Sequence, residues 1–404
     1  MGDRHLANVA YDSSEFVGSL GVNTHVGWSK TPYGDLQKVA AGARYLGVHN
    51  LRDSLDASSY AGIDQLAGAG FKFDLESHSD LKTFMRQVGA LAQAHPGFVA
   101  AIEGPNEVDG WPISYNGKSG YPAASAFQAA LYAQVRADRL LRNVPVYNVT
   151  VSGLDARKYE ALGDLSGATD YANVHIYYGG GQPSYGWSQA DPTFHWNNWL
   201  AAGQIGAPGK PTVITETGAS SAHLWGGGVD ETTQAKQILN ALMNSAKSGV
   251  AATYLYELVE SRRGDATNSE AHYGLFRYDW TPKPAAVAVH NFTRILTDGS
   301  ATGGFNPGAL EYIVQGLPET GQHFLFQEQH GVYDLVVWAE PDVWNETTHT
   351  PIPAPTAQVT VSLAAPRMVA VYDPLKAATP LQSLGRVTRL TVSLTDHPLI
   401  IELR

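Results

Sequence analysis

Short runs of β-branched and aromatic residues alternate with longer helix-forming segments along the first three-quarters of the chain. Segments such as Thr31–Ala43, Ala123–Leu141 and Glu231–Ser248 have helical spacing. The runs that read as strands are Gly18–Val22, Tyr45–Leu51, Lys72–Leu75, Val99–Glu103, Val146–Val151, Tyr171–Ile176, Thr212–Glu216 and Ala252–Glu257. Eight strands alternating with helices predict an α/β fold of the (β/α)8 barrel type. The alternative, a doubly wound open sheet, usually has fewer repeats, and no strand here precedes a Gly-rich dinucleotide fingerprint.

The pattern changes near residue 300. Asp298–Gly308 is rich in Gly, Ser, Thr and Asn and predicts a linker, and Pro341–Pro355, with its four prolines, predicts a loop. The remaining runs alternate without helical segments: Phe324–Gln327, Tyr333–Ala339, Gln358–Leu363, Ala370–Tyr372, Arg386–Leu394 and Pro398–Leu403. We therefore expect a barrel over residues 16–298 and a small antiparallel β-sandwich over 299–404, which a strand from residues 1–15 could join.

The amino-acid composition excludes several classes of partner and of functional site. The 404 residues carry a net charge of −11 without a block of Lys or Arg, which argues against nucleic acid or an anionic membrane as the main partner. The absence of cysteine rules out disulfides, thiolate metal sites and cysteine nucleophiles. No stretch reaches about 18 apolar residues, and residues 1–20 lack a signal-peptide pattern. The compartment stays open: secreted or periplasmic if a leader was removed before Met1, otherwise cytoplasmic.

Catalytic residues of a barrel lie at the C-terminal ends of its strands and in the loops that follow. The fourth predicted strand leads into Glu103-Gly104-Pro105-Asn106-Glu107, and the seventh into Thr215-Glu216-Thr217-Gly218. Two carboxylates at one barrel end are the equipment for glycoside hydrolysis, in which one protonates the leaving oxygen and the other attacks the anomeric carbon. Their environments must separate their pKa values. A single Glu at a strand end is usually only a solvated residue.

These motifs resemble the clan of retaining glycoside hydrolases on (β/α)8 barrels (clan A), over roughly Gly18–Phe292. The resemblance implies that Glu107 is the acid/base, that Glu216 is the nucleophile, and that Asn106 hydrogen-bonds the sugar 2-hydroxyl. Arg52 stands where the clan places an arginine near the nucleophile, and a structural salt bridge is its alternative role.

The sequence Val174-His175-Ile176-Tyr177 looks like the clan's strand-six pair, with a satisfied core histidine as the alternative for His175. The stretch Gly274–Ala285 also looks like the clan's last loop and helix start. The tail from Gly321 to Trp338 is similar to glycoside hydrolase family 39 and its bacterial exopolysaccharide-cleaving relatives.

One departure lies at strand eight, where the clan often places a Trp and this chain has Tyr256 and Glu257. Tyr256 is expected to contact the sugar, and Glu257 either binds sugar hydroxyls or pairs with a neighbouring Arg. Further expected substrate contacts lie in the loops after strands: Trp28, Trp111, Trp225, His25 and His78. For each aromatic residue, packing over the barrel top is the alternative.

The sequence therefore predicts a retaining glycosidase that acts on a poly- or oligosaccharide by two carboxylates, with no metal and no organic cofactor required. A catalytically inactive carbohydrate-binding barrel is the main alternative. A metal-dependent hydrolase fits less well, because Asn23-Thr24-His25-Val26-Gly27 holds a single His where such enzymes commonly show His-x-His. An added interaction role for the β-sandwich stays open.

Overall fold

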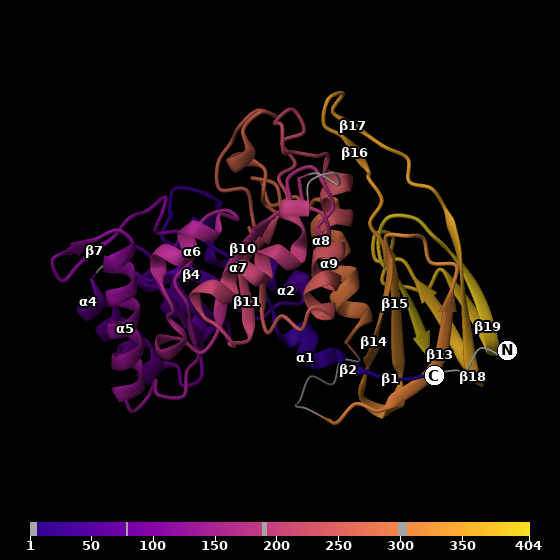
Figure 1. The fold of residues 1–404 in the computed structure, drawn as a ribbon, viewed down its shortest axis with the longest axis horizontal. Coiled ribbons are helices and arrows are strands. Elements are labelled where there is room, and N and C mark those ends of the chain that lie inside the picture. Colours follow the sequence, from indigo (N-terminus) through magenta and orange to yellow (C-terminus); the bar gives the residue numbers. More distant parts are fainter. Residues whose placement is uncertain (1–5, 78–79, 188–191, 298–304) are drawn as a thin grey trace.

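A computed structural model describes residues 6–77, 80–187, 192–297 and 305–404. Its N-terminal part is a parallel barrel whose strands follow one another in chain order (Figure 1). The strands are β3 (Leu20–Asn23), β4 (Asn50–Ser54), β5 (Lys72–Glu76), β6 (Val99–Glu103), β9 (Val146–Tyr147), β10 (Ala172–Tyr177), β11 (Thr212–Gly218) and β12 (Thr253–Leu255). A parallel bridge between Tyr147 and Tyr171 closes the ring between β9 and β10. The predicted barrel is confirmed.

Helices surround the barrel, as the Ala- and Leu-rich segments predict. They are α2 (Leu36–Leu46), α3 (Tyr60–Gly68), α4 (Leu81–Ala94), α5 (Tyr121–Ala137), α6 (Ala156–Leu162), α7 (Trp196–Gly206), α8 (Glu231–Lys247) and α9 (Pro284–Ile295). Their boundaries have local causes. Asp230 caps α8 by accepting the Thr233 N–H, Pro284 occupies the first position of α9, and Gly47 ends α2 at φ 75°. None of the helices in these described ranges is long and apolar enough to cross a membrane.

The C-terminal part is a mostly antiparallel β domain. Its main strands are β13 (Ala309–Gln315), β14 (Gly321–Gln327), β15 (Tyr333–Ala339), β18 (Ala357–Tyr372), β19 (Gln382–Leu394) and β20 (Leu399–Leu403), joined at the edges by β1 (Leu6–Val9) and β2 (Tyr11–Asp12). The long strand β18 pairs with β13 through Thr360–Leu363 and with β20 through Val369–Tyr372. The predicted β domain is therefore confirmed, and one strand, β2, pairs in parallel with β14.

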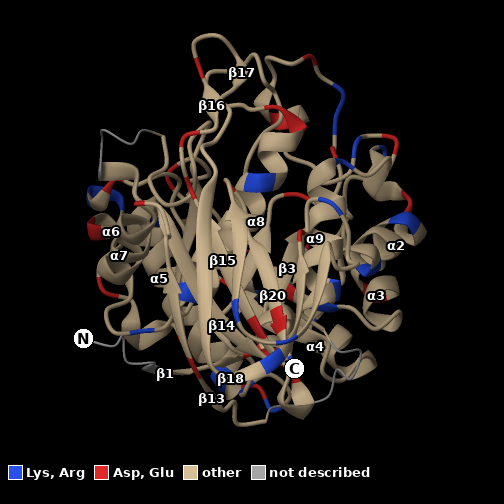
Figure 2. Cartoon of the chain, turned by 90° about the vertical axis from the view of Figure 1, so that its right-hand side faces the viewer, with Lys and Arg blue, Asp and Glu red and all other residues tan. Residues whose placement is uncertain are grey.

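The β domain and the barrel share a core along β15. Leu335 and Val337 point into the core of the β domain, whereas Val336 and Trp338 belong to the main hydrophobic core of the barrel. Trp338 is fully buried. Figure 2 shows the β domain from outside, with its sheet in front of α8 and α9. Because successive side chains of a strand point to opposite faces, β15 joins the two cores.

Several details differ from the sequence-based expectations. The second barrel strand, expected at Tyr45–Leu51, lies at Asn50–Ser54, and Tyr45 and Leu46 end helix α2. The proline-rich stretch Pro341–Pro355, expected to be a loop, contains the short hairpin β16 (Trp344–Asn345) and β17 (Thr350–Pro351). The runs expected as two strands, Gln358–Leu363 and Ala370–Tyr372, are one strand, β18. Strand β13 and helix α1 (Ser13–Gly18) were not expected. A strand of only two residues needs few backbone donors, so even Pro351 within β17 does not prevent it.

Candidate active site

Four barrel strands bring charged side chains together at their C-terminal ends. Arg52 lies on β4, His175 on β10 and Glu216 on β11, and Glu107 follows β6. The chain leaves β6 through Gly104, where an added Cβ would lie 2.1 Å from the Gln128 Oε1. Glu107 itself has φ 38°, and its backbone N–H donates to the Thr150 Oγ1 at 3.0 Å. This unusual backbone conformation turns the Glu107 side chain toward the barrel axis.

Glu216 is surrounded by donors. Arg52 Nη1 donates to Glu216 Oε1 at 2.6 Å, and the Tyr177 hydroxyl donates to Oε2 at 2.7 Å. His175 Nδ1 lies 3.6 Å from Oε2. Burial raises the pKa of Glu216, but the charges of His175 and Arg52 and the Tyr177 hydrogen bond outweigh it, so the pKa lies below its ordinary value. Glu216 is therefore held as a carboxylate.

The other N–H groups of the Arg52 guanidinium donate to side chains deeper in the barrel and to Asn106. Its Nε and Nη2 donate to the two carboxylate oxygens of Glu103 at 2.6 and 3.0 Å. Nη1 also donates to Asn23 Oδ1, and Nη2 donates to Asn106 Oδ1, both at 2.8 Å. Arg52 is 4% exposed and Glu103 is fully buried. Such a set of charge-assisted bonds fixes the guanidinium plane, and with it the position of Glu216.

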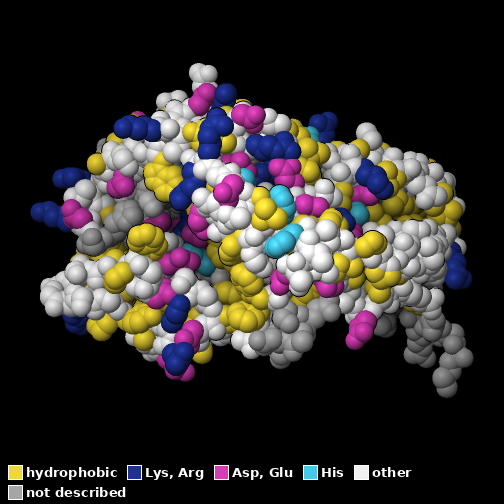
Figure 3. Space-filling view, turned by 90° about the horizontal axis from the view of Figure 1, so that it is seen from above, with side chains coloured by type: hydrophobic (Ala, Val, Ile, Leu, Met, Phe, Trp, Pro, Cys, Tyr) yellow, Lys and Arg dark blue, Asp and Glu magenta, His cyan; other side chains and the backbone are white. Residues whose placement is uncertain are grey.

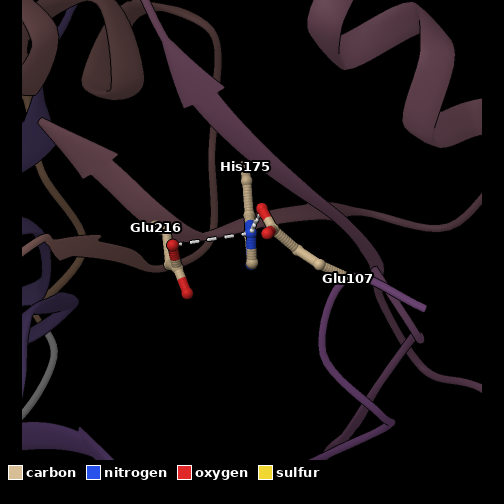
Figure 4. A group of neighbouring side chains, drawn as sticks. All are labelled: Glu107, His175 and Glu216. Carbon is tan, nitrogen blue, oxygen red and sulfur yellow. Dashed lines mark hydrogen bonds and ion pairs between the residues drawn. The ribbon is translucent and has the colours of Figure 1, made fainter. Parts of the chain in front are cut away.

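His175 connects the two candidate carboxylates (Figure 4). Its Nδ1 lies 2.9 Å from Glu107 Oε1, and its Nε2 lies 3.0 Å from Thr215 Oγ1. The Thr215 hydroxyl donates to Glu103 or to Asn173, so its oxygen is left to accept from Nε2. Burial lowers the pKa of His175, but the charge of Glu216 and the contact with Glu107 outweigh it, and the pKa is raised. Both ring nitrogens are therefore placed to donate.

Glu107 and Glu216 face each other from opposite sides of His175. One ligand atom from each of the three residues lies within 4.8 Å of the others. The Glu107 side chain is 22% exposed and that of Glu216 is 11% exposed, so both reach the solvent side of the site. They differ in their partners, because Arg52 binds Glu216 directly, whereas the ion-pair contact of Glu107 is with His175.

A cleft of about 920 Å³ opens over this group. Figure 3 looks down on this end of the molecule, where acidic and histidine side chains lie in a hollow with hydrophobic side chains around it. The expected site residues that line the cleft are His25, Trp28, Arg52, Asn106, Glu107, Trp111, Tyr177, Glu216 and Tyr256. Trp28 is 42% exposed and Trp111 is 71% exposed. The Trp28 ring also stacks on that of His25, with centroids 4.0 Å apart.

Three expected site residues lie elsewhere. His175 is buried behind the carboxylates, and Trp225 packs edge-on against Trp187 instead of lining the cleft. His78 lies outside the described residues. Glu257 is buried and does not line the cleft, and its described hydrogen bonds and ion-pair contacts do not include an arginine. It accepts hydrogen bonds from Tyr33 at 2.9 Å and Ser261 at 3.3 Å, and His25 Nε2 lies 3.4 Å away.

The pKa values of Glu257 and His25 are both shifted, although Glu257 is buried and the His25 side chain is 22% exposed at the cleft. Burial raises the pKa of Glu257 to about 8, against hydrogen bonds from Tyr33 and Ser261 that lower it. Burial lowers the pKa of His25 to about 4, and Glu216 opposes this shift. At neutral pH, Glu257 is therefore a protonated acid beside a neutral imidazole, which leaves no full charge at this position.

Sequence reasoning missed a layer of polar residues inside the barrel, beneath the carboxylates. It consists of Asn23, Asp74, Glu103, Asn173 and Thr215, all buried. The signal was present: each is a polar residue within a predicted barrel strand or, for Asn23, directly after one, and a buried polar group without a partner would be costly. Arg262, Glu270 and Tyr273, from the loop after β12, also line the cleft.

Within the described ranges, two groups of three side chains are close enough to share a metal ion. One is Glu107, His175 and Glu216, where Arg52 and Tyr177 already occupy both oxygens of Glu216. The other is a buried group in the β domain: Glu328, Asp334 and Glu402. Burial and the charges of its neighbours raise the pKa of Asp334 far above its ordinary value, so a bound proton relieves the repulsion there.

No protein-family model matches the chain, and no curated protein matches its sequence. Solved structures match its fold over nearly the full length. A family 39 glycoside hydrolase from Bacteroides cellulosilyticus aligns with 98% of this chain and 82% of its own, at 14% identity and a TM-score of 0.66. A family 39 enzyme from Xanthomonas axonopodis pv. citri aligns with 100% of this chain and 98% of its own, at 12% identity and 0.61.

A monomeric β-xylosidase from Caulobacter crescentus aligns with 99% of this chain and 98% of its own, at 15% identity and a TM-score of 0.61. The fold is therefore that of family 39 glycoside hydrolases, a parallel barrel followed by a β domain. At these identities, the likeness concerns the fold alone.

Proposed function

We propose that the protein is a retaining glycoside hydrolase acting on a poly- or oligosaccharide. The single observation that carries the proposal is the pair Glu107 and Glu216. Their carboxylates meet across His175 with oxygens within 4.8 Å, one of them held ionised by Arg52 and Tyr177. Carboxyl groups about 5–5.5 Å apart suit a covalent intermediate, whereas inverting enzymes need roughly 6.5–9.5 Å to admit a water between carboxylate and sugar.

In the proposed reaction, Glu216 attacks the anomeric carbon while the Glu107 carboxylic acid gives its proton to the leaving oxygen. The glycosidic bond breaks and a glycosyl ester forms on Glu216. Glu107, now a carboxylate, takes a proton from water, which attacks the anomeric carbon and releases Glu216. The greater exposure of Glu107 supports its assignment as the group that exchanges protons, and the Arg52 contact supports Glu216 as the nucleophile.

Asn106 is proposed to bind the sugar 2-hydroxyl. Its Oδ1 accepts from Arg52 Nη2, so its amide N–H₂ is free to turn toward the cleft as a donor. Trp28, Trp111 and Tyr256 are proposed to contact the sugar rings through their exposed faces. The chemistry is assigned to the barrel, residues 16–298, and residues 299–404 to a supporting β domain.

The test is hydrolysis of a panel of aryl glycosides and polysaccharides. Because one structure with this fold is a β-xylosidase, xylosides and xylan come first in the panel. The anomer released first is read by proton NMR before mutarotation. We expect retention of configuration, and loss of activity in Glu216→Gln with the fold intact by circular dichroism. Inversion, or a Glu216→Gln enzyme as active as wild type, would refute the mechanism. Binding without hydrolysis would support the alternative of an inactive carbohydrate-binding barrel.

A further inference from the structure

A second cavity, of about 440 Å³, lies between the barrel and the β domain. One wall is the loop after β10, with Tyr185 and Trp187, and the other is the β16–β17 hairpin, with Asp342, Trp344 and Glu346. In Figure 1 the hairpin stands at the top of the molecule, on the same side as the loops that follow the barrel strands. The cavity is separate from the cleft, because the two share no lining residue among those described.

The cavity walls are held rigidly. Gln237, on α8, donates to the carbonyls of Gly180 and Gly181 at 3.1 and 2.7 Å. From the β domain, Glu340 accepts the Ser184 N–H at 2.8 Å. A Cβ added at Gly180 would lie 2.7 Å from Glu346 Oε1, so the glycine lets the hairpin approach the loop backbone. A pocket built in this way exists before any ligand arrives.

The lining combines aromatic rings with acceptor groups. Trp187 is half-buried, and its indole N–H donates to the Tyr177 carbonyl at 3.0 Å, which fixes the ring. Trp344 is 3% exposed, and its indole N–H has no hydrogen-bond partner among the described residues. Asn345 also lines the cavity, with Asp342 and Glu346 exposed at its mouth. Aromatic rings accept the C–H faces of a sugar, and among these rings Trp187 is the accessible one, because Trp344 and Tyr185 are buried. Carboxylates and amides bind sugar hydroxyls.

The charged side chains of the cavity determine which sugars it can bind favourably. The acidic side chains of the described lining are the carboxylates of Asp342 and Glu346, and this lining contains no Lys, Arg or His. A uronic acid bound there would bring a third negative charge without a counter-charge. Neutral sugars, and sugars with a free amino group, meet no such penalty.

We propose that this cavity is a second glycan-binding site, which holds a neutral or amino-bearing segment of the polysaccharide outside the cleft. The inference rests on the proposed function for the identity of its ligand. Its connection to the cleft is short: Trp187 binds the backbone of Tyr177, and the Tyr177 hydroxyl binds Glu216. A segment held against Trp187 therefore lies beside the catalytic end of the barrel.

The test compares two double variants of the full chain. Asp342→Asn/Glu346→Gln removes both charges of the cavity. Glu311→Gln/Glu319→Gln removes two exposed charges elsewhere on the β domain and is the matched control. Each double variant is made in two backgrounds. The wild-type background is used for kinetics, and the Glu216→Gln background is used for binding. Binding is read as retardation in native gels containing xylan, β-glucan, chitosan or alginate, and activity on polymer is compared with activity on an aryl glycoside.

We expect the cavity variant to bind its polymer at least about tenfold more weakly than the control, because the loss of even one hydrogen bond to a charged group is equivalent to about tenfold or more in affinity. Its kcat/KM on the aryl glycoside should be unchanged. Three results would overturn the second site. The two double variants could be retarded equally by every polymer, or the Glu216→Gln parent could be retarded by none of them. The cavity variant could also lose retardation on alginate alone, which is the acidic polymer. Failure of the proposed function is a different result: no hydrolysis of any substrate by wild type.

Discussion

The guanidinium of Arg52 joins Glu216 to the buried Glu103, with Nη1 2.6 Å from Glu216 Oε1 and Nε 2.6 Å from Glu103 Oε2. One positive charge therefore serves two carboxylates. The fully buried Glu103 depends on Arg52 and on the donors Asn173 and Thr215. Glu216 has Tyr177 as a second donor, and it keeps access to the cleft. The arrangement anchors Arg52 on the interior side and presents Glu216 on the other.

Replacing Arg52 by methionine should destabilise the fold as well as abolish activity. Arg52→Met leaves the fully buried carboxyl group of Glu103 without its main partner, and breaking such a pair costs about 3–5 kcal/mol. The free energy of unfolding, measured with urea, checks this. Arg263→Met is the control, since Arg263 is exposed and lies over the Tyr278 ring at 4.4 Å. Equal losses in the two variants would show that Arg52 does not support Glu103.

Replacing Tyr177 by phenylalanine should move the acid limb of the pH–activity profile to higher pH. Glu216 must be ionised to attack, and the Tyr177 hydroxyl is one of the groups that lower its pKa. Without that bond the pKa of Glu216 rises, so activity is lost at a higher pH as the pH falls. We also expect kcat to fall about tenfold or more, because a hydrogen bond to a charged group contributes about 1.5–3 kcal/mol.

Tyr273→Phe is the matched control for Tyr177→Phe. Tyr273 lines the same cleft and packs edge-on against the Tyr177 ring at 5.5 Å. Its acid limb should stay where wild type has it. An acid limb of Tyr177→Phe that coincides with that of wild type would contradict the role of the hydroxyl.

Replacing Glu257 by glutamine should make stability less sensitive to pH. The pKa of Glu257 is raised from 4.5 to about 8, so between these values the folded chain holds a proton that the unfolded chain has lost. The free energy of unfolding of wild type therefore falls as the pH rises through this window. Glutamine does not titrate, so the free energy of unfolding of Glu257→Gln should not show this fall. Relative to wild type, the variant should therefore gain stability between pH 5 and pH 8.

Urea unfolding at several pH values measures this shift. The exposed Glu319→Gln serves as the control, and its difference from wild type should stay flat. A Glu257→Gln difference that is equally flat would mean that Glu257 is ionised in the folded chain.

Replacing Trp111 by alanine should weaken the use of long substrates without unfolding the protein. Trp111 is 71% exposed at the mouth of the cleft, so its loss should change the free energy of unfolding by only about 0.5 kcal/mol. If it packs against a sugar ring, kcat/KM on an oligosaccharide should fall about tenfold. Leu140→Ala, at an exposed site away from the cleft, is the control. Equal kinetics for both variants would remove Trp111 from the binding surface.

The sequence was enough to predict eight barrel strands in the right order, and the expected range of each overlaps the observed strand. The second overlaps only at Asn50 and Leu51, because it was expected at Tyr45–Leu51 and lies at Asn50–Ser54.

The sequence also placed Glu107 and Glu216 at strand ends, and the structure brings them together. It did not predict the partners of Glu257, since Tyr33 lies 224 residues away in the chain, in the short 3-10 helix Pro32–Gly34. Contacts of this kind depend on the closed barrel, and no local pattern encodes them.

Other misses have local causes. Strand β13 follows directly on a Gly-rich segment, and the β16–β17 hairpin contains Pro351, so turn signals hid both. Trp225 was expected in the cleft from its loop position alone. The packing of Trp187 against it decides its place instead.

Helix α1 makes the two halves of the molecule inseparable. Phe16 lies between Phe292 of α9, at 6.2 Å, and Phe326 of β14, at 4.9 Å. The β domain also recruits β1 and β2, which precede α1 in the chain. Recombination between this protein and a relative therefore has no clean crossover near residue 300. A chimera that takes residues 305–404 from one parent must also take residues 6–18 from that parent. Otherwise the contact between Phe16 and Phe326 would join residues from different parents.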